Sequence, residues 1–247
     1  MIVAPKKIKF FYLPLNREVI FSLVLTVILL SYGVIQFDDN KSDQAVFNSQ
    51  PKAYYQGPTN KQQISLAVNV AWGTEYIPQI LEILEAEEVS ATFFLVGNWV
   101  EKFPELVVEI KEAGHEIGNH GYRHRHPKKL VEEELIALIK KNEDLIKNTA
   151  DYKTKLFAPP YGEVDQRIVK VAHKIGYKTI MWTVDTIDWQ RPEPEVIIER
   201  VVPKAENGAI VLMHPTQPTA AALPKIIKSL KDDGYKLVTI TELLNQE

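Results

Sequence analysis

The sequence predicts an α/β fold in which short buried strands alternate with amphipathic helices. Three junctions, AGHEIG, IGYKT and DGYKL, each place a glycine where a helical pattern stops and a strand pattern begins. A left-handed helix C-cap favours glycine because glycine has no Cβ. Regular alternation of this kind favours parallel strands covered by helices, and the pattern leaves an α/β barrel and a doubly wound sheet open.

Six short apolar runs, rich in β-branched and aromatic residues, are the predicted strands. They are residues 64–70, 91–96, 156–158, 179–183, 209–213 and 236–238. The stretches between them repeat apolar residues with a helical period. The predicted helices are residues 77–86, 104–113, 128–148, 165–175, 194–205 and 223–232. Pro104 and Pro194 stand near helix starts, where the missing N–H leaves no hydrogen bond unmade.

An uncharged run of 19 residues, VIFSLVLTVILLSYGVIQF at residues 19–37, precedes this pattern. Such a run is long enough to cross a hydrocarbon core as a helix. Lysines and Arg17 precede it and aspartates follow it, so the positive-inside rule keeps residues 1–18 in the cytoplasm. The alternative, a cleaved signal peptide, requires a shorter apolar core and a small-x-small cleavage site, and residues 31–47 contain none. We expect a single-pass signal anchor in the cell membrane and an extracytoplasmic domain.

Residues 38–61 are rich in Asp, Asn, Ser, Gln, Pro and Gly, which predicts a tether between the anchor and a domain at residues 62–247. The 247 residues, 45% of them hydrophobic, suffice for one main domain. A formal net charge of −3 provides no extended basic surface, so nucleic acid is not expected as a partner. The absence of cysteine excludes disulfides, thiolate metal sites and a thiol nucleophile.

Polar and aromatic residues stand at or after the ends of four predicted strands and of the short segment 116–118, at the position where α/β folds collect their active groups. They are Asn69, His120, His124, Pro159, Pro160, Tyr161, Asp185, Asp188 and His214. Because the carboxyl ends of parallel strands share one edge of the sheet, we expect these side chains to converge on one rim.

Two histidines of the segment NHGYRHRH, His120 and His124, have a spacing that suits two imidazoles on one metal ion. The alternative is a solvated surface cluster of adjacent His and Arg side chains. His214 ends a strand in IVLMHP, where a carboxylate such as Asp188 would orient the ring and raise its pKa, as a general acid requires. The alternative is a core histidine bonded to a backbone carbonyl. Aromatic residues such as Trp189 would form a stacking surface for sugar rings, or else belong to the core.

Five segments, LAVNVAWG, EIGNHGYRH, FAPPYG, WTVDTIDW and IVLMH, occur in the order and approximate spacing of the motifs of polysaccharide deacetylases. Over residues 64–247 the chain thus resembles this family, the carbohydrate esterases with a NodB homology domain, and most of all its branch in endospore-forming bacteria. The resemblance implies a distorted (β/α) barrel. It also implies hydrolysis of the N-acetyl group of N-acetylglucosamine or N-acetylmuramic acid units in cell-wall glycan.

The resemblance also assigns roles to residues of this chain. Two adjacent aspartates, a general base and a metal ligand, are replaced by Asn69 and Val70, and an arginine that orients the base is replaced by Ala158. The residues that match the family pattern are His120 and His124 as metal ligands, Tyr161 as oxyanion donor, Asp188 with Trp189, and His214 as the acid for the leaving amine. The expected substrate-binding residues are Trp189, Pro159, Pro160 and Tyr161.

These replacements predict weak or lost activity. An amide at Asn69 has no useful basicity, and loss of a positioned general base removes about 10²- to 10⁴-fold in rate. Val70 offers no electron pair, which leaves two protein ligands, so we expect Zn, Co or Mn to be weakly bound or absent. A glycan-binding relative of the deacetylases is therefore the first hypothesis. The alternative is an active metal-dependent N-deacetylase in which Asn69 is a weak third ligand and Glu75, His115 or His126 takes the proton.

Overall fold

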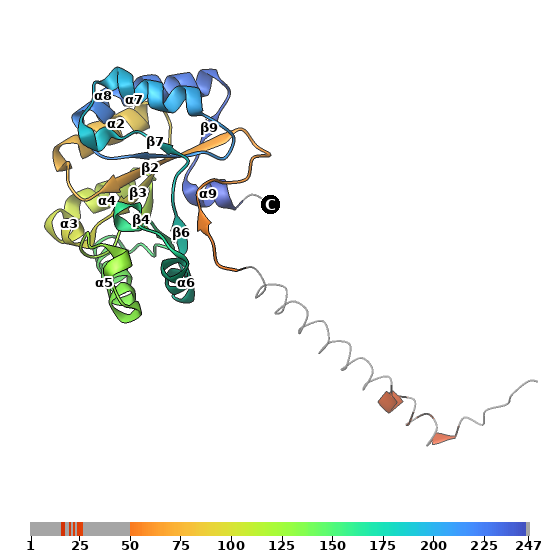
Figure 1. Cartoon of the computed structure of the whole chain (residues 1–247). Helices are drawn as coiled ribbons and strands as arrows, with labels where there is room; N and C mark the ends of the chain where they lie inside the picture. The colour runs from red at the N-terminus through yellow and green to blue at the C-terminus, as the bar shows by residue number, and fades with distance from the viewer. Residues whose placement is uncertain (1–15, 18–19, 21, 23, 27–49, 246–247) are drawn as a thin grey trace, which may run out of the picture. The chain divides into compact units, whose positions relative to one another are not determined.

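The computed structural model describes residues 16–17, 20, 22, 24–26 and 50–245 (Figure 1). The chain divides into two compact units, Met1–Gln50 and Pro51–Glu247. In the first unit, residues 17, 20, 22 and 24–26 are helical. No helix within the described part of the chain is both long and apolar enough to cross a membrane. Most of the predicted span at residues 19–37, and the first half of the predicted tether (residues 38–49), lie outside the described residues.

The second unit is built on a nine-stranded sheet in which all strand pairs are parallel. The strands are β1 (Ala53–Tyr54), β2 (Gln63–Val70), β3 (Thr92–Leu95), β4 (Glu116–Asn119), β5 (Leu156–Phe157), β6 (Lys178–Ile180), β7 (Val184–Asp185), β8 (Ile210–Met213) and β9 (Lys236–Leu237). Their order is β1-β6-β5-β4-β3-β2-β8-β7, and β9 pairs with β2. The predicted α/β class with parallel strands is confirmed.

The sheet is strongly curled. Strands β6 and β7 lie near opposite ends of the strand order, yet only residues 181–183 separate them in the chain. The linking segment bonds to both edges, because Met181 N donates to Tyr54 O next to β6 and Thr183 N donates to Ile210 O in β8. Consecutive Cα atoms are about 3.8 Å apart, so this short link keeps the two ends close. The fold is therefore a parallel α/β half-barrel and not an open doubly wound sheet.

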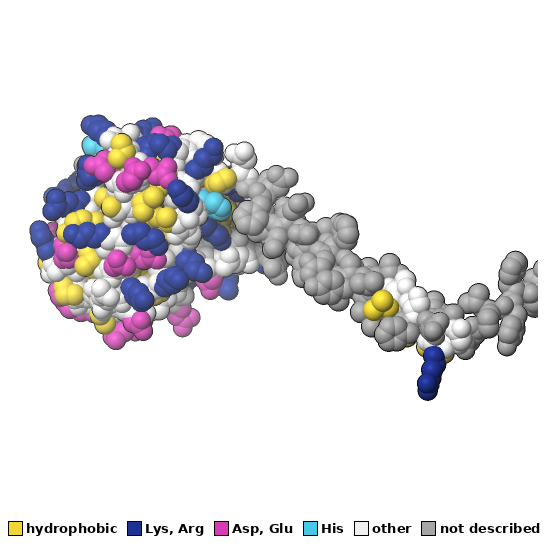
Figure 2. Space-filling model, turned by 90° about the horizontal axis from the view of Figure 1, so that it is seen from below, with side chains coloured by type: hydrophobic (Ala, Val, Ile, Leu, Met, Phe, Trp, Pro, Cys, Tyr) yellow, Lys and Arg dark blue, Asp and Glu magenta, His cyan; other side chains and the backbone are white. Residues whose placement is uncertain are grey.

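Helices cover the outside of the curled sheet (Figure 1). They are α2 (Ile77–Ala86), α3 (Gly97–Lys102), α4 (Pro104–Glu112), α5 (Glu132–Ala150), α6 (Gln166–Lys174), α7 (Pro194–Val201), α8 (Gln217–Asp232) and α9 (Ile240–Leu244). Helix α8 packs against α2 and α7, and α5 packs against α3, α4 and α6. On the face drawn in Figure 2, acidic and basic side chains are interspersed and apolar side chains are scattered between them.

Strand β2 divides its side chains between two sides of the sheet. Leu66, Val68 and Val70 belong to the large apolar cluster that also contains side chains of α2, α4 and α8. Ala67 belongs to a second cluster, which includes side chains of β3, β5 and α9. Successive side chains of a strand point to opposite faces. Asn69 therefore shares the face of Ala67, and Val70 points to the side covered by helices.

Several elements differ from the sequence prediction. The predicted strand at 179–183 is shorter, since the chain leaves β6 to reach the opposite edge as β7. The last predicted helix begins earlier, at Gln217, because the Thr216 side chain caps it by accepting from Thr219 N. The predicted helix at 128–148 begins later, because residues 127–129 form a separate 3-10 turn. Residues 51–61, expected within the tether, belong to the compact unit, where β1 pairs with β6.

Candidate functional site

The candidate site lies at the edge where the parallel strands end. His120 directly follows β4, His214 directly follows β8, and Asn69 is the penultimate residue of β2. Contacts join segments that follow different strands. His120 Nδ1 lies 2.7 Å from the carbonyl oxygen of Ala158, which follows β5. His214 Nδ1 lies 2.8 Å from Asp188 Oδ1, which follows β7. The structure thus brings together residues that the sequence places far apart.

His120 and His124 form a close pair, with their Nε2 atoms 3.2 Å apart. The carbonyl of Ala158 can only accept a hydrogen bond, so it fixes the Nδ1–H tautomer of His120 and leaves a lone pair on Nε2. Two imidazole nitrogens on a tetrahedral zinc, at bond lengths of about 2.0–2.1 Å, lie about 3.3 Å apart. The pair therefore has the spacing of two ligands of one ion, and this spacing also fits a direct hydrogen bond between the rings.

Both rings of this pair are held neutral. Burial is the main cause that lowers the pKa of His120 to about 3, and the charge of His124 contributes next. Burial likewise lowers the pKa of His124, followed by the charges of His214 and His126. The influence of His214 on both rings indicates that the residues after β4 and after β8 face a common space. Neutral imidazoles are the species that bind metal ions.

A third ligand is missing from the pair. Among the residues that the structure describes, no group of three His, Cys, Asp or Glu side chains is placed to hold an ion. Asn69, at the end of β2, has a buried side-chain oxygen, Oδ1, without a hydrogen-bond partner. Val70 is fully buried in the large apolar cluster. The residues therefore fit a site with two histidine ligands, and they do not fit the three-ligand set of a catalytic zinc site.

Asp188 and His214 form the second part of the site. The Asp188 side chain is fully buried, and its carboxylate accepts from His214 Nδ1 at 2.8 Å, from His214 N at 2.6 Å and from Thr219 Oγ1 at 2.6 Å. The carboxylate fixes the ring with hydrogen on Nδ1, so Nε2 is free to exchange a proton. This arrangement has the geometry that a histidine general acid requires. The other acidic candidate, Asp185, accepts from Ile187 N within its own turn.

Trp72 covers His214 from the segment that follows β2. The two rings are stacked, with centroids 5.7 Å apart and an interplanar angle of 7°. The next residue, Gly73, has φ +77°, and a Cβ there would lie 1.9 Å from the Pro215 carbonyl oxygen. Glycine is therefore required for this close approach of the two loops. The sequence prediction gave no role to Trp72, although Trp72 and Gly73 end the first motif segment, LAVNVAWG.

Tyr161 lies beside the histidine pair in a left-handed backbone conformation, with φ 60° and ψ 9°. This conformation is uncommon for a residue with a side chain and stores local strain. Its ring contacts His124 edge-on, with centroids 4.3 Å apart, and stacks on His126, with centroids 4.0 Å apart. His126 Nδ1 in turn lies 2.8 Å from Glu163 Oε1, and this His126–Glu163 pair was also missed. The Tyr161 N–H donates to no other described residue.

The expected substrate-binding residues differ in exposure. Trp189 and Tyr161 are more than half exposed, and Trp72 is 39% exposed. Pro159 and Pro160 are buried, so of the FAPPYG segment it is Tyr161 that faces solvent. Ala158, in the position assigned to an arginine, is buried in the second apolar cluster. The site therefore presents aromatic rings around two groups of histidines.

The three proposed substitutes for the general base occupy different places. His115 precedes β4, so it lies at the opposite end of that strand from His120 and does not reach the rim. Glu75 lies in the 3-10 turn Thr74–Tyr76 that follows β2. His126 contacts Tyr161 and is paired with Glu163. Of the three, His126 is the one with a contact to the other site residues.

Comparisons with known proteins agree with these features. The sequence pattern of the family described as polysaccharide deacetylase matches residues 56–180. The chain is 45% identical over 197 residues to the uncharacterized protein YlxY of Bacillus subtilis, a match that covers 80% of this chain and 62% of that protein. It is 33% identical over 249 residues to a peptidoglycan-N-acetylglucosamine deacetylase of Bacillus cereus, which covers 96% of this chain and 90% of the relative.

A solved structure with the same architecture is that of BA3943 from Bacillus anthracis, described as a pseudoenzyme of carbohydrate esterase family 4. It superposes with a TM-score of 0.78 at 46% identity, and the match covers 80% of this chain and 70% of that one. A BA3943 mutant described as having restored enzymatic activity superposes with the same TM-score at 45% identity, covering 80% and 73% of the two chains.

Proposed function

The chain belongs to the polysaccharide deacetylase family, and we propose that it binds N-acetylated cell-wall glycan, such as peptidoglycan, with weak or lost N-deacetylase activity. The observation that carries this proposal is that β2 ends in a buried amide and a buried isopropyl group, Asn69 and Val70, at the two positions where the resemblance to the family expects aspartates. The similarity to BA3943, which is described as a pseudoenzyme, supports it. So does the similarity to a peptidoglycan deacetylase over nearly the whole chain.

The chemistry of the rim explains the expected loss of activity. Amide hydrolysis needs a base to take a proton from water and an acid to give one to the leaving amine. Asp188 and His214 have the arrangement of the acid, but Asn69 supplies no base. A divalent ion, Zn, Co or Mn, would supply Lewis-acid activation of water when bound, and His120 and His124 would hold it. With two histidines the ion is bound weakly, so this activation is weak as well.

Glycan binding needs none of the missing groups. Sugar rings stack on exposed aromatic side chains, and the rim presents Trp72, Tyr161 and Trp189. His214 and the Tyr161 N–H remain available as hydrogen-bonding groups for hydroxyl and acetamido oxygens. We propose these residues as the contact surface for the glycan.

Calorimetry and an acetate assay test the proposal together. We expect heat of binding with chito-oligosaccharides at millimolar concentration, and little acetate release from glycol chitin or peptidoglycan with Zn²⁺, Co²⁺ or Mn²⁺ present. Trp189→Ala should weaken binding severalfold, because it removes one stacking surface, and a stacked pair of rings contributes about 0.5–1.5 kcal/mol. Absence of heat from a folded sample would remove the binding proposal.

The second candidate is an active N-deacetylase, a hydrolase of non-peptide carbon–nitrogen bonds, with substituted catalytic groups. The observation that favours it is the His126–Glu163 pair beside Tyr161 and His124, because a carboxylate-bound imidazole can accept a proton. On this reading Asn69 Oδ1 is a weak third ligand. Acetate release at rates typical of deacetylases, abolished by His126→Gln, would establish it in place of the binding function.

We also propose that residues 19–37 anchor the chain in the cell membrane and hold the domain outside the cytoplasm. The apolar run and the charges that flank it support this topology. Because the chain contains no cysteine, a single Lys61→Cys substitution gives one labelling site without background. We expect a membrane-impermeant maleimide to label this site in intact cells whose wall is permeable to it. Labelling only after lysis would contradict the topology.

A further inference from the structure

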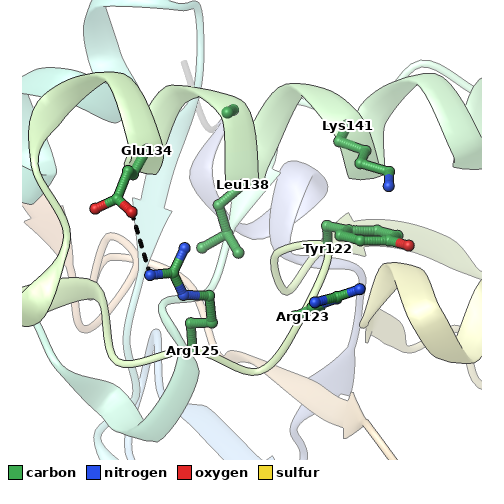
Figure 3. A pocket seen from close by; sticks show the side chains of 7 residues that line it. Tyr122, Arg123, Arg125, Glu134, Leu138 and Lys141 are labelled. Carbon is green, nitrogen blue, oxygen red and sulfur yellow. Dashed lines mark hydrogen bonds and ion pairs between the residues drawn. The ribbon is translucent and has the colours of Figure 1, made fainter.

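A pocket of about 370 Å³ lies beside the candidate site, between the segment that follows β4 and helix α5 (Figure 3). Its lining residues are Tyr122, Arg123, Arg125, Glu134, Ala137, Leu138 and Lys141. None of these residues has a role in the proposed deacetylase chemistry. The lining contains three cationic side chains and one carboxylate, so the pocket carries an excess of positive charge.

The segment that follows β4 separates this pocket from the histidine site. Arg123 and Arg125 line the pocket. His124 and His126, which alternate with them in sequence, both contact the ring of Tyr161 in the site. This short segment therefore forms a wall between the pocket and the histidine site. A ligand longer than one sugar unit that lies across this wall would contact both the pocket and the site.

Two of the three cations have no carboxylate partner. Arg125 forms an ion pair with Glu134, with 3.3 Å between nitrogen and oxygen. Arg123 and Lys141 instead lie on opposite faces of the Tyr122 ring in Figure 3, at 5.5 Å and 3.5 Å from its centroid. Neither makes an ion pair with another described residue. The Tyr122 ring thus lies between two cations that no described carboxylate neutralises, so an anion that enters the pocket would meet uncompensated positive charge.

The ring that organises the pocket is firmly placed. Tyr122 N donates to Leu138 O at 2.9 Å, and Tyr122 O accepts from Asn98 N at 2.8 Å. Tyr122 OH donates to Glu101 Oε2 at 3.0 Å. A Cβ on Gly97 would lie 2.9 Å from the Cα of Tyr122, so glycine permits the close approach of α3 to this segment. The two cations therefore flank a fixed aromatic surface and not a mobile loop.

We propose that this pocket binds a carboxylate group carried by the glycan chain or its peptide branches. The proposal rests on the proposed glycan-binding function and adds a preference for anionic over neutral glycan. Arg123 and Lys141 supply the charge and Tyr122 supplies the contact surface. The pairing of Glu134 with Arg125 neutralises the carboxylate of the pocket wall, so it opposes an incoming anion less. The site residues hold the sugar on the other side of the wall.

Calorimetric titration of the full chain in mild non-ionic detergent tests the preference. The probes are neutral chitotetraose, a peptidoglycan tetrasaccharide with free peptide carboxylates, the same tetrasaccharide with those carboxylates converted to methylamides, and a glycerol-phosphate oligomer. We expect the free-carboxylate fragment to bind about fivefold more tightly than the methylamide form at low salt, because two exposed cations contribute a modest, screened attraction. In 0.5 M salt the two affinities should become nearly equal.

Substitutions on α5 and on the segment that follows β4 test whether the pocket causes the preference for the free-carboxylate fragment. Arg123→Gln with Lys141→Gln should abolish the fivefold preference and leave chitotetraose binding unchanged. Arg123→Lys should retain most of it. The matched control is Lys147→Gln, since Lys147 is exposed on α5 and does not line the pocket. Both changed side chains are exposed, so circular dichroism should show an intact fold.

The outcomes separate this inference from the function on which it rests. Equal affinity for the charged and methylamide fragments, or a preference that survives in the double variant, would overturn the pocket assignment and leave glycan binding intact. Tighter binding of the phosphate oligomer than of the carboxylate fragment would overturn the assignment to a carboxylate. Loss of binding to every glycan, including neutral chitotetraose, would overturn the proposed function and this inference with it.

Discussion

Introducing two negative charges at the end of β2 should strengthen the binding of a divalent metal ion at the His120–His124 site. The perturbation is the double substitution Asn69→Asp and Val70→Asp. In the present chain His120 and His124 offer two neutral nitrogens 3.2 Å apart, and the buried amide oxygen of Asn69 has no partner. A carboxylate in this position would supply the charge that the pair lacks.

The expected gain follows from burial and charge. Asn69 is 6% exposed and Val70 is fully buried, so both carboxylates would be withdrawn from water. The expected gain in metal affinity comes from the carboxylate at position 69 alone, because Val70 points to the side covered by helices. A unit charge about 4 Å from a divalent ion, at an effective dielectric constant of ~20, is attracted by about 8 kcal/mol. Desolvation of a buried carboxylate offsets several kcal/mol of this attraction. A net gain of about 3 kcal/mol corresponds to roughly 100-fold tighter metal binding.

Without the ion the same change should weaken the fold. Two uncompensated charges at the end of a buried strand cost about 3–5 kcal/mol, and saturation at 100 times the Kd regains about 2.7 kcal/mol. Zn²⁺ titration by calorimetry and the melting temperature with and without Zn²⁺ measure both effects. The control is Val70→Asn, which has the shape of the aspartate without its charge. Metal affinity of the folded double variant within about threefold of the unchanged chain would refute the reasoning.

Three further outcomes follow from single contacts. Asp188→Ala should lower the free energy of unfolding in urea by about 3–5 kcal/mol, because the buried donors of His214 lose their acceptor. Asp188→Asn keeps an acceptor oxygen and should lower it less. Equal losses of stability in the two variants would contradict this reasoning. Burial lowers the pKa of His115 to about 4. Between pH 6.5 and 4 the unfolded ring therefore binds a proton that the folded ring does not, so stability should fall by about 3 kcal/mol as the pH drops, and His115→Gln should remove that part of the slope. Gly118→Ala should destabilise the fold by about 1–3 kcal/mol, because its Cβ would lie 2.3 Å from the Phe94 ring; a melting temperature equal to that of the unchanged chain would contradict this.

The sequence predicted most of the strands and the direction of the sheet, since an element such as β2 carries a long buried run whose pattern is local. It did not predict β7, because two residues cannot establish a pattern and β7 exists only through its pairing with β8. The strand and helix pattern did not decide between a barrel and a doubly wound sheet, because the curling of the sheet depends on the short link between β6 and β7. Among site residues, the histidines, Asp188 and Tyr161 were predicted, because the family motifs give these residue types a chemical role. The stacking of Trp72 on His214 was not, because it depends on how two distant loops meet.

The contacts of Asp188 explain why the presence of the Asp188–His214 pair is not by itself a sign of N-deacetylase activity. Its carboxylate accepts from the backbone and ring of His214, directly after β8, and from Thr219 in the first turn of α8. Removing it would leave buried donors without acceptors, so the fold requires this residue whether or not catalysis occurs. Asn69 is different, because its neutral amide oxygen has no hydrogen-bond partner, so no contact of the fold requires a carboxylate at this position. If the proposed loss of hydrolysis is right, the base would therefore be lost before the acid, because the fold requires Asp188 and does not require a carboxylate at position 69.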